Sequence, residues 1–294
     1  MNRQQVITTW IRAMRIHTLI ASISPVLIGM CIAYKHQNRC DVFLFMFTIL
    51  TAIFLQIGTN LANDYFDFYK GADSFDRIGP KKSLQQGLIS TEAMKYAFSF
   101  SFFIAILCGC YLALCTHPLL SLLLLLAVIL GIFYTAGPYA LSYNGCSDIC
   151  VFLFFGMIAT TMSCYVQTKQ LYLEAWIAGM GPGAIATSLL TINNLRDHIS
   201  DRKGEKNTLV VFFGEKFGKI EYVSFLSLSF AIPLFLYFSY PYNKKILFPL
   251  LAIPFGIQLV HNTCISTDYK ENLSKTVLFF LLYTCLFVWG LLCQ

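Results

Sequence analysis

The stretch NLANDYFDFYKGADSFDRIGP, residues 60–80, combines the two features that decide the fold of this chain. It begins at the end of a run that contains no charged residue, residues 42–61. Carboxylates are costly to place at the mouth of a membrane-length apolar segment, so acids in this position indicate a functional site. The stretch therefore predicts a membrane helix whose end carries acidic chemistry. Its aspartates, within 13 positions of one another, are Asp64, Asp67, Asp73 and Asp76.

A second acidic stretch, NNLRDHISDRKGEKNTL at residues 193–209, closes another apolar run. Asp64 and Asp67 are three positions apart, and on a helix this spacing places both side chains on one face. The same holds for Asp197 and Asp201, which are four positions apart. Four carboxylates that converge require cations, and hard oxygen ligands favour magnesium or calcium. Because magnesium commonly links carboxylates to phosphate oxygens, the two stretches predict a split site for a magnesium-bound diphosphate.

Basic residues are interleaved with these acids, and they suit the oxygens of a phosphate group. An arginine grips phosphate with two N–H donors, and a lysine supplies a compact positive charge. Acidic residues that can hold a metal ion, next to basic residues that can bind phosphate oxygens, suit a diphosphate leaving group. Negative charge develops on this group in the transition state, and both the metal and the bases can neutralise it. For any single base a topology signal is the commoner explanation, and most nearby aromatic residues serve packing. The basic candidates are Lys70, Arg77, Lys81, Lys82, Arg196, Arg202 and Lys206.

The composition places the chain in a membrane. Of its 294 residues, 57% are hydrophobic and only 12% are charged, and the mean hydropathy is +0.64. A soluble domain carries about 25% charged residues. Spans of about 20 residues divide the chain into an all-α, polytopic membrane bundle of about nine transmembrane helices, with residues 1–294 forming a single domain. The predicted spans are residues 18–34, 42–62, 93–115, 119–136, 149–167, 172–194, 220–240, 246–265 and 275–292.

The distribution of lysine and arginine predicts the orientation. Nine crossings place the termini on opposite sides of the bilayer, and basic residues favour cytoplasmic loops. Both acidic stretches then face the cytoplasm, where soluble anions and magnesium are available. The net charge of +6 is explained by this bias, so no nucleic-acid partner is expected. With the N-terminus inside, only five of the 21 basic residues fall outside: Lys35, Arg39, Lys169, Lys244 and Lys245.

The two acidic stretches resemble those of the UbiA superfamily of intramembrane prenyltransferases, and within it the menaquinone branch. Four flanking stretches agree as well: RIHTLIASISPVLIG (15–29), YTAGPYALSYNG (134–145), FFG (154–156) and YVQT (165–168). The resemblance runs through about three-quarters of the chain, and after Gly218 only hydropathy agrees. The matching motif positions are Asn63, Asp64, Asp67, Gly71, Asp73, Arg77, Gly79 and Pro80 in the first stretch and Asn193, Asn194, Arg196, Asp197, Asp201, Lys206, Thr208 and Leu209 in the second.

The resemblance implies a helical bundle around a central cavity, in which two magnesium ions hold a polyprenyl diphosphate at the cytoplasmic end. Diphosphate would leave, a carbon of an aromatic acceptor would attack the allylic cation, and the acceptor would lose a carboxyl group. In the menaquinone branch the acceptor is 1,4-dihydroxy-2-naphthoate, the product is a demethylmenaquinone, and the enzyme is a multi-pass protein of the cell inner membrane. By the same resemblance the magnesium ligands are Asn63, Asp64, Asp67, Asp197 and Asp201, the diphosphate contacts are Asn63, Lys70, Arg77, Lys81, Arg196 and Lys206, and Tyr134 contacts the cation or the diphosphate.

Two positions depart from the family pattern. Cys146, Ser147 and Asp148 stand where a Gly-Glu pair is usual, and Glu205 replaces a glycine. The first departure lies near the expected acceptor side and leaves other acceptors open, such as 4-hydroxybenzoate, an isomeric dihydroxynaphthoate or a tetrapyrrole. A secondary transporter is a more distant alternative, because intramembrane acids also couple ions to substrates. Acids at span ends, beside bases, favour the transferase.

Overall fold

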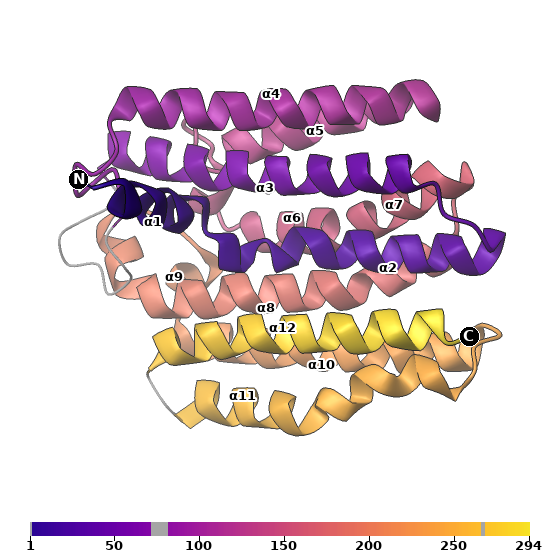
Figure 1. Ribbon diagram of the computed structural model, residues 1–294. Coiled ribbons are helices and arrows are strands. Elements are labelled where there is room, and N and C mark those ends of the chain that lie inside the picture. Colours follow the sequence, from indigo (N-terminus) through magenta and orange to yellow (C-terminus); the bar gives the residue numbers. More distant parts are fainter. Residues whose placement is uncertain (1, 72–81, 266–267) are drawn as a thin grey trace.

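The computed structural model describes residues 2–71, 82–265 and 268–294, and every regular element in these ranges is helical. Figure 1 shows the long helices running side by side along one common direction, with the two termini at opposite ends of the bundle. This arrangement agrees with the odd number of crossings that the sequence predicts. The elements are α1 (Arg3–Met14), η1 (Ile16–Thr18), α2 (Ile20–Gln37), α3 (Val42–Tyr69), α4 (Thr91–Cys115), α5 (Leu119–Phe133), η2 (Leu141–Tyr143), α6 (Ser147–Phe152), η3 (Leu153–Ile158), α7 (Ala159–Thr168), α8 (Leu173–Lys203), α9 (Leu209–Phe213), α10 (Glu215–Ser239), η4 (Lys244–Ala252), α11 (Ile253–Ile265) and α12 (Tyr269–Leu292).

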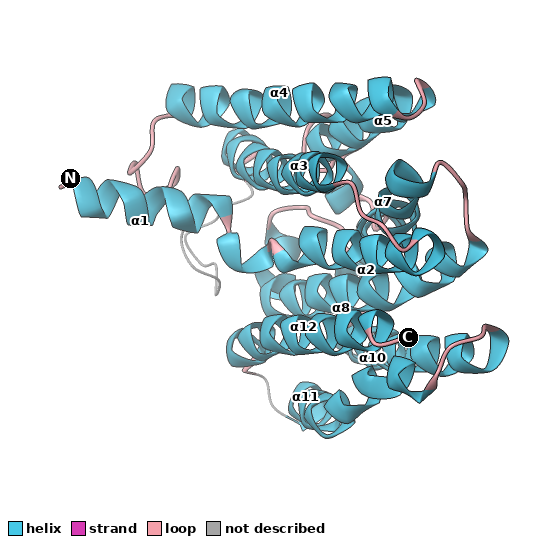
Figure 2. Ribbon diagram, turned by 45° about the vertical axis from the view of Figure 1, so that its right-hand side comes forward, coloured by secondary structure: helices cyan, strands magenta, loops and turns pink. Residues whose placement is uncertain are grey.

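The helices account for about the nine spans that the sequence predicts. Within the described ranges, seven helices are long and apolar enough to cross a membrane, counting α6 to α7 and η4 to α11 each as one continuous span. An eighth span forms if α1 and α2 are taken together, although the chain bends by 46° at the break between them. Figure 2 shows the two helices on either side of this break. The remaining predicted span corresponds to α5, an apolar helix that has 15 residues and is therefore only about 22 Å long. The chain is thus an integral, multi-pass membrane protein.

The helices α3 and α8 continue past the points at which the sequence predicted their spans to end. The predicted ends were residues 62 and 194, whereas α3 reaches Tyr69 and α8 reaches Lys203. The prediction was short because it followed hydropathy, and the acidic turns are polar. These turns stay helical because their side chains bond to one another and to neighbouring elements rather than facing lipid. Both aspartate pairs therefore lie on the last turns of long helices, at the same end of the bundle (Figure 1).

The core is aromatic on the side of the bundle formed by α8, α10 and α12. Tyr222 of α10 and Phe279, Tyr283 and Phe287 of α12 are all fully buried. Each buried phenol has a partner: Tyr222 shares a 2.8 Å hydrogen bond with Thr276, and the Tyr283 hydroxyl donates to the Ser229 carbonyl at 2.7 Å. Buried tyrosines usually find such partners. This side of the bundle is a rigid support for α8, which carries the second aspartate pair.

Glycines allow the span α6 to α7 to approach α8 at backbone distance. A Cβ atom built on Gly179 would lie 2.7 Å from the Gly156 carbonyl oxygen and 2.8 Å from the Met157 Cα. Close contact through small residues is a common way for membrane helices to pack, because lipid provides no hydrophobic drive for their association. The contact fixes α6, which covers one side of the cavity described below.

We expect Gly179→Ala to destabilise the protein by about 1–3 kcal/mol, because the added methyl group meets backbone atoms that have no room to move. Gly256→Ala is the matched control, since a Cβ there would meet side-chain ring atoms and no backbone: Phe230 at 2.8 Å and Phe279 at 3.8 Å. The outer end of a side chain can turn aside, whereas a packed backbone cannot. The measurement is the thermal unfolding midpoint of each detergent-solubilised protein. Equal shifts in the two variants would contradict this account of the packing.

Candidate active site

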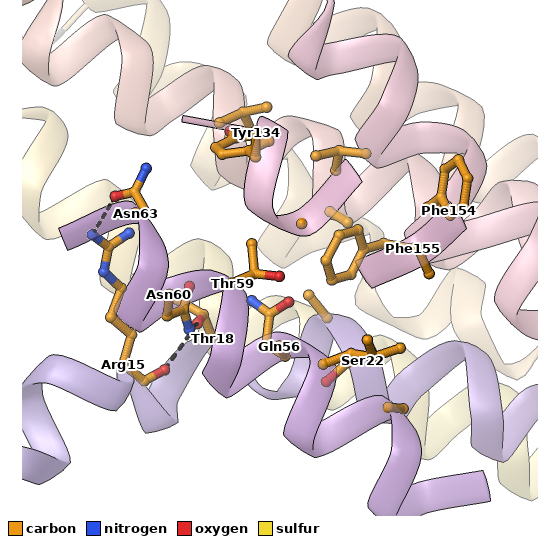
Figure 3. Close-up of a pocket in the computed structure, with 18 of the residues that line it drawn as sticks. Arg15, Thr18, Ser22, Gln56, Thr59, Asn60, Asn63, Tyr134, Phe154 and Phe155 are labelled. Atoms are coloured by element: carbon orange, nitrogen blue, oxygen red, sulfur yellow. Dashed lines mark hydrogen bonds between the residues drawn. The ribbon is translucent and has the colours of Figure 1, made fainter. Parts of the chain in front are cut away.

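A cavity of about 870 Å³ runs through the bundle between α2, α3, α5, α6 and α8. Along α3 its lining changes from Thr48 and Ala52 to Asn63, Asp64 and Asp67. Away from the aspartates the wall is largely apolar, and Figure 3 shows Phe154 and Phe155 there, far from Arg15 and Asn63. The cavity therefore suits a long apolar ligand with a charged head. The apolar lining includes Leu55, Leu120, Leu123, Leu124, Ala127, Leu130, Val151, Phe154, Phe155, Ile158 and Val166.

The first aspartate pair is buried and is held by basic residues from two other parts of the chain. Asp64 and Asp67 are 3% and 4% exposed. The Arg15 guanidinium donates to Asp64 Oδ1 at 2.6 Å. The Lys82 ammonium lies 2.6 Å from Asp67 Oδ2 and 3.6 Å from Asp64 Oδ1. One cation thus bridges both carboxylates, as their spacing on one helical face predicts.

Asn63 and Asp67 are also held from the segment that follows α5. The Asn63 side-chain amide donates to Thr135 Oγ1 at 2.7 Å, and its oxygen accepts from Arg15 at 3.0 Å (Figure 3). The Tyr143 hydroxyl donates to Asp67 Oδ1 at 2.9 Å. Both polar ends of Asn63 and both oxygens of Asp67 are therefore used, so their orientations are fixed.

The second aspartate pair carries its own bases. Arg196 binds Asp197 bidentately, with 2.8 Å from Nε to Oδ1 and 2.6 Å from Nη2 to Oδ2, and it also donates to Asn193 at 2.7 Å. Lys206 lies 3.8 Å from Asp201. The Lys206 ammonium is also close enough to Asp67 to interact with it electrostatically. The two motifs therefore meet at one end of the cavity.

The structure brings most of the predicted site residues to this end. Six of them line the cavity, whereas Asp197 and Asp201 lie behind Arg196 and Lys206. Lys70 lies outside the lining, and Arg77 and Lys81 lie outside the described residues. The predicted residues in the lining are Asn63, Asp64, Asp67, Tyr134, Arg196 and Lys206.

Lys70 has other partners. Its ammonium donates to the Gly137 carbonyl at 2.8 Å and lies 4.1 Å from the centroid of the Tyr143 ring. Partial burial lowers the pKa of Lys70, and the Asp67 carboxylate opposes this shift. Through these two contacts Lys70 connects the end of α3 with the segment that follows α5.

Sequence reasoning missed Arg15 as a site residue. Arg15 was counted only among the basic residues expected on the cytoplasmic side, because its partners Asn63 and Asp64 are 48 and 49 residues away in the chain. The Arg15 backbone is left-handed, with φ of 52°, at the break between α1 and α2. Such a conformation is uncommon for a non-glycine residue and is concentrated at functional sites. The only signal in the sequence was the position of Arg15 at the start of a matching stretch.

The donor set fits a hard divalent cation by its chemistry, because both motifs offer carboxylate and amide oxygens. The bridging of Asp64 and Asp67 by the Lys82 ammonium shows that these two carboxylates can share one cation. In the parts of the chain that the structure describes, no three His, Cys, Asp or Glu side chains are grouped so as to hold a metal ion. The four aspartates are instead neutralised by four bases, Arg15, Lys82, Arg196 and Lys206.

Glu205, which departs from the family pattern, occupies a backbone conformation that favours glycine. Its φ is 54°, at the turn that follows α8. This turn brings Lys206 back toward α8, and the Lys206 amide donates to the Asp201 carbonyl at 2.9 Å. The turn therefore keeps the glycine geometry although the glycine is absent.

We expect Glu205→Gly to fold and act like the wild type, because glycine adopts this conformation without steric cost. Glu205→Val should be less stable than Glu205→Gly by about 1–2 kcal/mol, since a branched Cβ is strained at positive φ. Thermal midpoints of the two purified variants test this difference. A valine variant as stable as the glycine variant would show that the turn is not left-handed.

Comparison with known proteins agrees with this architecture. Residues 22–291 match the sequence profile of the UbiA prenyltransferase family, which continues well beyond Gly218. The 1,4-dihydroxy-2-naphthoate octaprenyltransferase of Escherichia coli (strain K12) is 38% identical over 223 residues, covering 73% of this chain and 72% of that protein. The Haemophilus influenzae protein of the same name is 32% identical over 227 residues, covering 75% and 74%.

A solved structure is similar along almost the whole chain. The UbiA homolog from Archaeoglobus fulgidus, bound to GPP and Mg2+, matches with a TM-score of 0.67 at 14% identity, covering 97% of this chain and 100% of that one. At this identity the likeness shows the fold alone. The helical membrane bundle predicted from the sequence is thereby confirmed.

Proposed function

The chain belongs to the UbiA prenyltransferase family, and on this basis we propose that it transfers a polyprenyl group from a polyprenyl diphosphate to 1,4-dihydroxy-2-naphthoate. Diphosphate and carbon dioxide leave, and the product is a demethylmenaquinol, the 1,4-dihydroxy form that yields demethylmenaquinone on later oxidation. The observation that carries the proposal is a single cavity that joins two buried aspartate motifs to a long apolar wall. The names of the bacterial relatives support this acceptor.

The charge balance of the polar end supports an anion that arrives together with cations. Among the described residues, each of the four aspartates is paired with a base, so a diphosphate that arrived alone would compete with buried carboxylates for these bases. Buried charges must be paired to avoid a large desolvation cost. A diphosphate with divalent cations restores the balance, because carboxylates can take the cations while bases turn to the phosphate oxygens. All four of these bases line the cavity, and the proposed diphosphate contacts among them are Arg196 and Lys206. Lys70, Arg77 and Lys81 remain proposed contacts from the adjoining segments.

We propose that magnesium is the cation, held by Asn63, Asp64, Asp67, Asp197 and Asp201. It would neutralise the charge that develops on the leaving diphosphate. The A. fulgidus homolog was solved with Mg2+ and GPP, which supports the same ligand class here. The pairing of Arg196 with Asp197 must then open, and the freed guanidinium can donate two hydrogen bonds to a phosphate.

The apolar part of the cavity serves the prenyl chain and the cation. When the bond between the prenyl C1 and the diphosphate oxygen breaks, an allylic cation forms, which water would quench. The leucine and phenylalanine lining excludes water, and the Tyr134 ring, which also lines the cavity, would offer an electron-rich face to the cation. The acceptor ring carbon then forms the new bond to C1, and loss of its carboxyl group as carbon dioxide returns the electrons that restore the aromatic ring.

The bundle also supports a membrane orientation. Both motifs lie at the end of the bundle that contains the N-terminus (Figure 1), and the bias of basic residues favours this end for the cytoplasm. We propose that the protein lies in the inner membrane, with the polar end of the cavity open to soluble substrates on the cytoplasmic side.

The departure at Cys146, Ser147 and Asp148 makes the acceptor the part of this proposal that most needs a test. The experiment incubates the protein in membranes with a labelled polyprenyl diphosphate, magnesium and a panel of acceptors that includes 4-hydroxybenzoate and an isomeric dihydroxynaphthoate. Transfer to 1,4-dihydroxy-2-naphthoate in clear preference supports the proposal. Preference for another acceptor would retain the transferase and overturn the branch, and transfer to no acceptor by the folded protein would favour the transporter.

A further inference from the structure

The segment between α5 and α6, residues 134–145, makes three hydrogen bonds to the end of α3. Thr135 accepts from the Asn63 amide at 2.7 Å, and Tyr143 donates to the Asp67 carboxylate at 2.9 Å. The carbonyl of Gly137 accepts from Lys70 at 2.8 Å. Two of the three partners on α3 are proposed ligands of the metal, so this segment acts directly on the first motif.

The segment has internal structure that fixes these contacts. Ser142 donates to the Tyr134 carbonyl from both its hydroxyl, at 2.7 Å, and its amide, at 2.9 Å. The turn between them contains Gly137 with φ of 76°. Thr135 and Ser142 are 1% and 2% exposed. The segment is therefore a closed loop that is buried at both ends and can hold a partner in a defined position.

Arg15 and Thr135 together fix the orientation of the Asn63 amide. The Arg15 guanidinium can only donate, so it takes the Asn63 oxygen, and the Thr135 hydroxyl accepts from Nδ2 on the other side (Figure 3). An amide has one accepting and one donating end, and only the accepting end can ligate a cation. Without a hydroxyl at position 135, the Asn63 amide nitrogen would lose its hydrogen-bond partner, and only Arg15 would hold the side chain in place.

Tyr143 fixes Asp67 in a similar way. Its hydroxyl takes one carboxylate oxygen while Lys82 takes the other. The ring of Tyr143 is in turn placed by the Lys70 ammonium, 4.1 Å from its centroid. Contacts therefore connect Lys70, which is exposed, through the Tyr143 ring to the buried carboxylate of Asp67.

We propose that the loop 134–145 positions the first aspartate motif for its cation and diphosphate, with Thr135 fixing Asn63 and Tyr143 fixing Asp67. Both are positioning residues, since they act through their partners on α3. The inference rests on the proposed function and deepens it. The same loop carries Tyr134 in the cavity wall, so one element sets the geometry of the diphosphate end and of the cation-stabilising ring together.

The test uses Tyr143→Phe and Thr135→Val in the detergent-solubilised full chain. Tyr139→Phe is the control for the first variant, because Tyr139 lies in the same loop and is 85% exposed. Thr135→Ser is the control for the second, because serine restores the hydroxyl. Calorimetric titration measures the binding of inorganic diphosphate at a series of magnesium concentrations, and the thermal midpoint without ligand records whether each variant is folded.

We expect Tyr143→Phe and Thr135→Val to weaken magnesium-dependent diphosphate binding by about 10- to 100-fold, the usual effect of removing a residue that orients a metal ligand. Tyr139→Phe and Thr135→Ser should bind like the wild type. Wild-type affinity in both test variants would overturn the inference. If Thr135→Val fails to fold, Tyr143→Phe and the serine control decide the result alone. Failure of the wild type itself to bind diphosphate with magnesium would instead contradict the proposed function.

Discussion

Replacing Asp64 with asparagine is expected to lower the rate of prenyl transfer by about 1000-fold or more, while the protein remains folded and inserted. The substitution keeps the shape of the side chain but removes the negative charge that binds a divalent cation. The loss of a catalytic metal contact costs several kcal/mol of transition-state stabilisation, and about 4 kcal/mol corresponds to this factor. Asp197→Asn should behave alike, because Asp197 is the buried anion of the second motif. The measurement is the initial rate of label transfer at saturating magnesium.

The matched control for these variants is Glu92→Gln. Glu92 is an exposed carboxylate in the first turn of α4, at the same end of the bundle as both motifs. Its loss should leave the rate of transfer within about twofold of the wild type, since Glu92 is not part of the cavity lining and salt screens an exposed charge. Full activity in Asp64→Asn and Asp197→Asn, with both proteins folded, would remove the aspartates from the proposed metal site.

Lys82→Met is expected to destabilise the protein by about 3–5 kcal/mol when no magnesium is present. The Lys82 ammonium is the shared partner of Asp64 and Asp67, and all three side chains are at most 6% exposed. Removal of one member of a buried ion pair leaves an uncompensated buried charge, which has this cost. If magnesium binds the same carboxylates, it should restore much of the stability, because a ligand that binds only the folded state stabilises it. Thermal midpoints with and without magnesium measure both effects.

Lys95→Met serves as the control for this experiment, because Lys95 is exposed on α4. It should change the thermal midpoint little, and magnesium should raise the midpoint of this variant no more than that of the wild type. A Lys82→Met protein as stable as Lys95→Met without magnesium would show that Lys82 does not neutralise the aspartate pair. If Lys82→Met is destabilised but magnesium does not restore its stability, the ion pairs of Lys82 are supported, whereas a magnesium site at the same carboxylates is contradicted.

The sequence predicted the bundle well because apolar length alone identifies membrane helices. It also placed each aspartate pair on one helical face, and the bridging of Asp64 and Asp67 by one ammonium agrees with that prediction. The ends of α3 and α8 were predicted seven and nine residues too early, at 62 and 194 rather than Tyr69 and Lys203. Hydropathy marks where a helix leaves an apolar environment, whereas its hydrogen bonds continue through the acidic turns.

The partners of the site were harder to predict. Arg15 reaches Asp64 across 49 residues of sequence, and no periodicity connects residues so far apart. Thr135 and Tyr143 lie in a loop, where the backbone follows no repeating pattern, so their contacts with Asn63 and Asp67 depend on tertiary packing. Lys70 was predicted to contact the diphosphate, and this stays a prediction. Its contacts with the Gly137 carbonyl and the Tyr143 ring again depend on tertiary packing that the sequence does not show.

The central claim is a magnesium-dependent, decarboxylating prenyl transfer to 1,4-dihydroxy-2-naphthoate. It is tested most directly with purified protein, a polyprenyl diphosphate and acceptor labelled in its carboxyl carbon, by measuring released carbon dioxide, diphosphate and prenylated product in the same sample. The account predicts one carbon dioxide and one diphosphate for each prenylated molecule, and none of the three without magnesium. Label retained in the prenylated product, or equal transfer without magnesium, would contradict it.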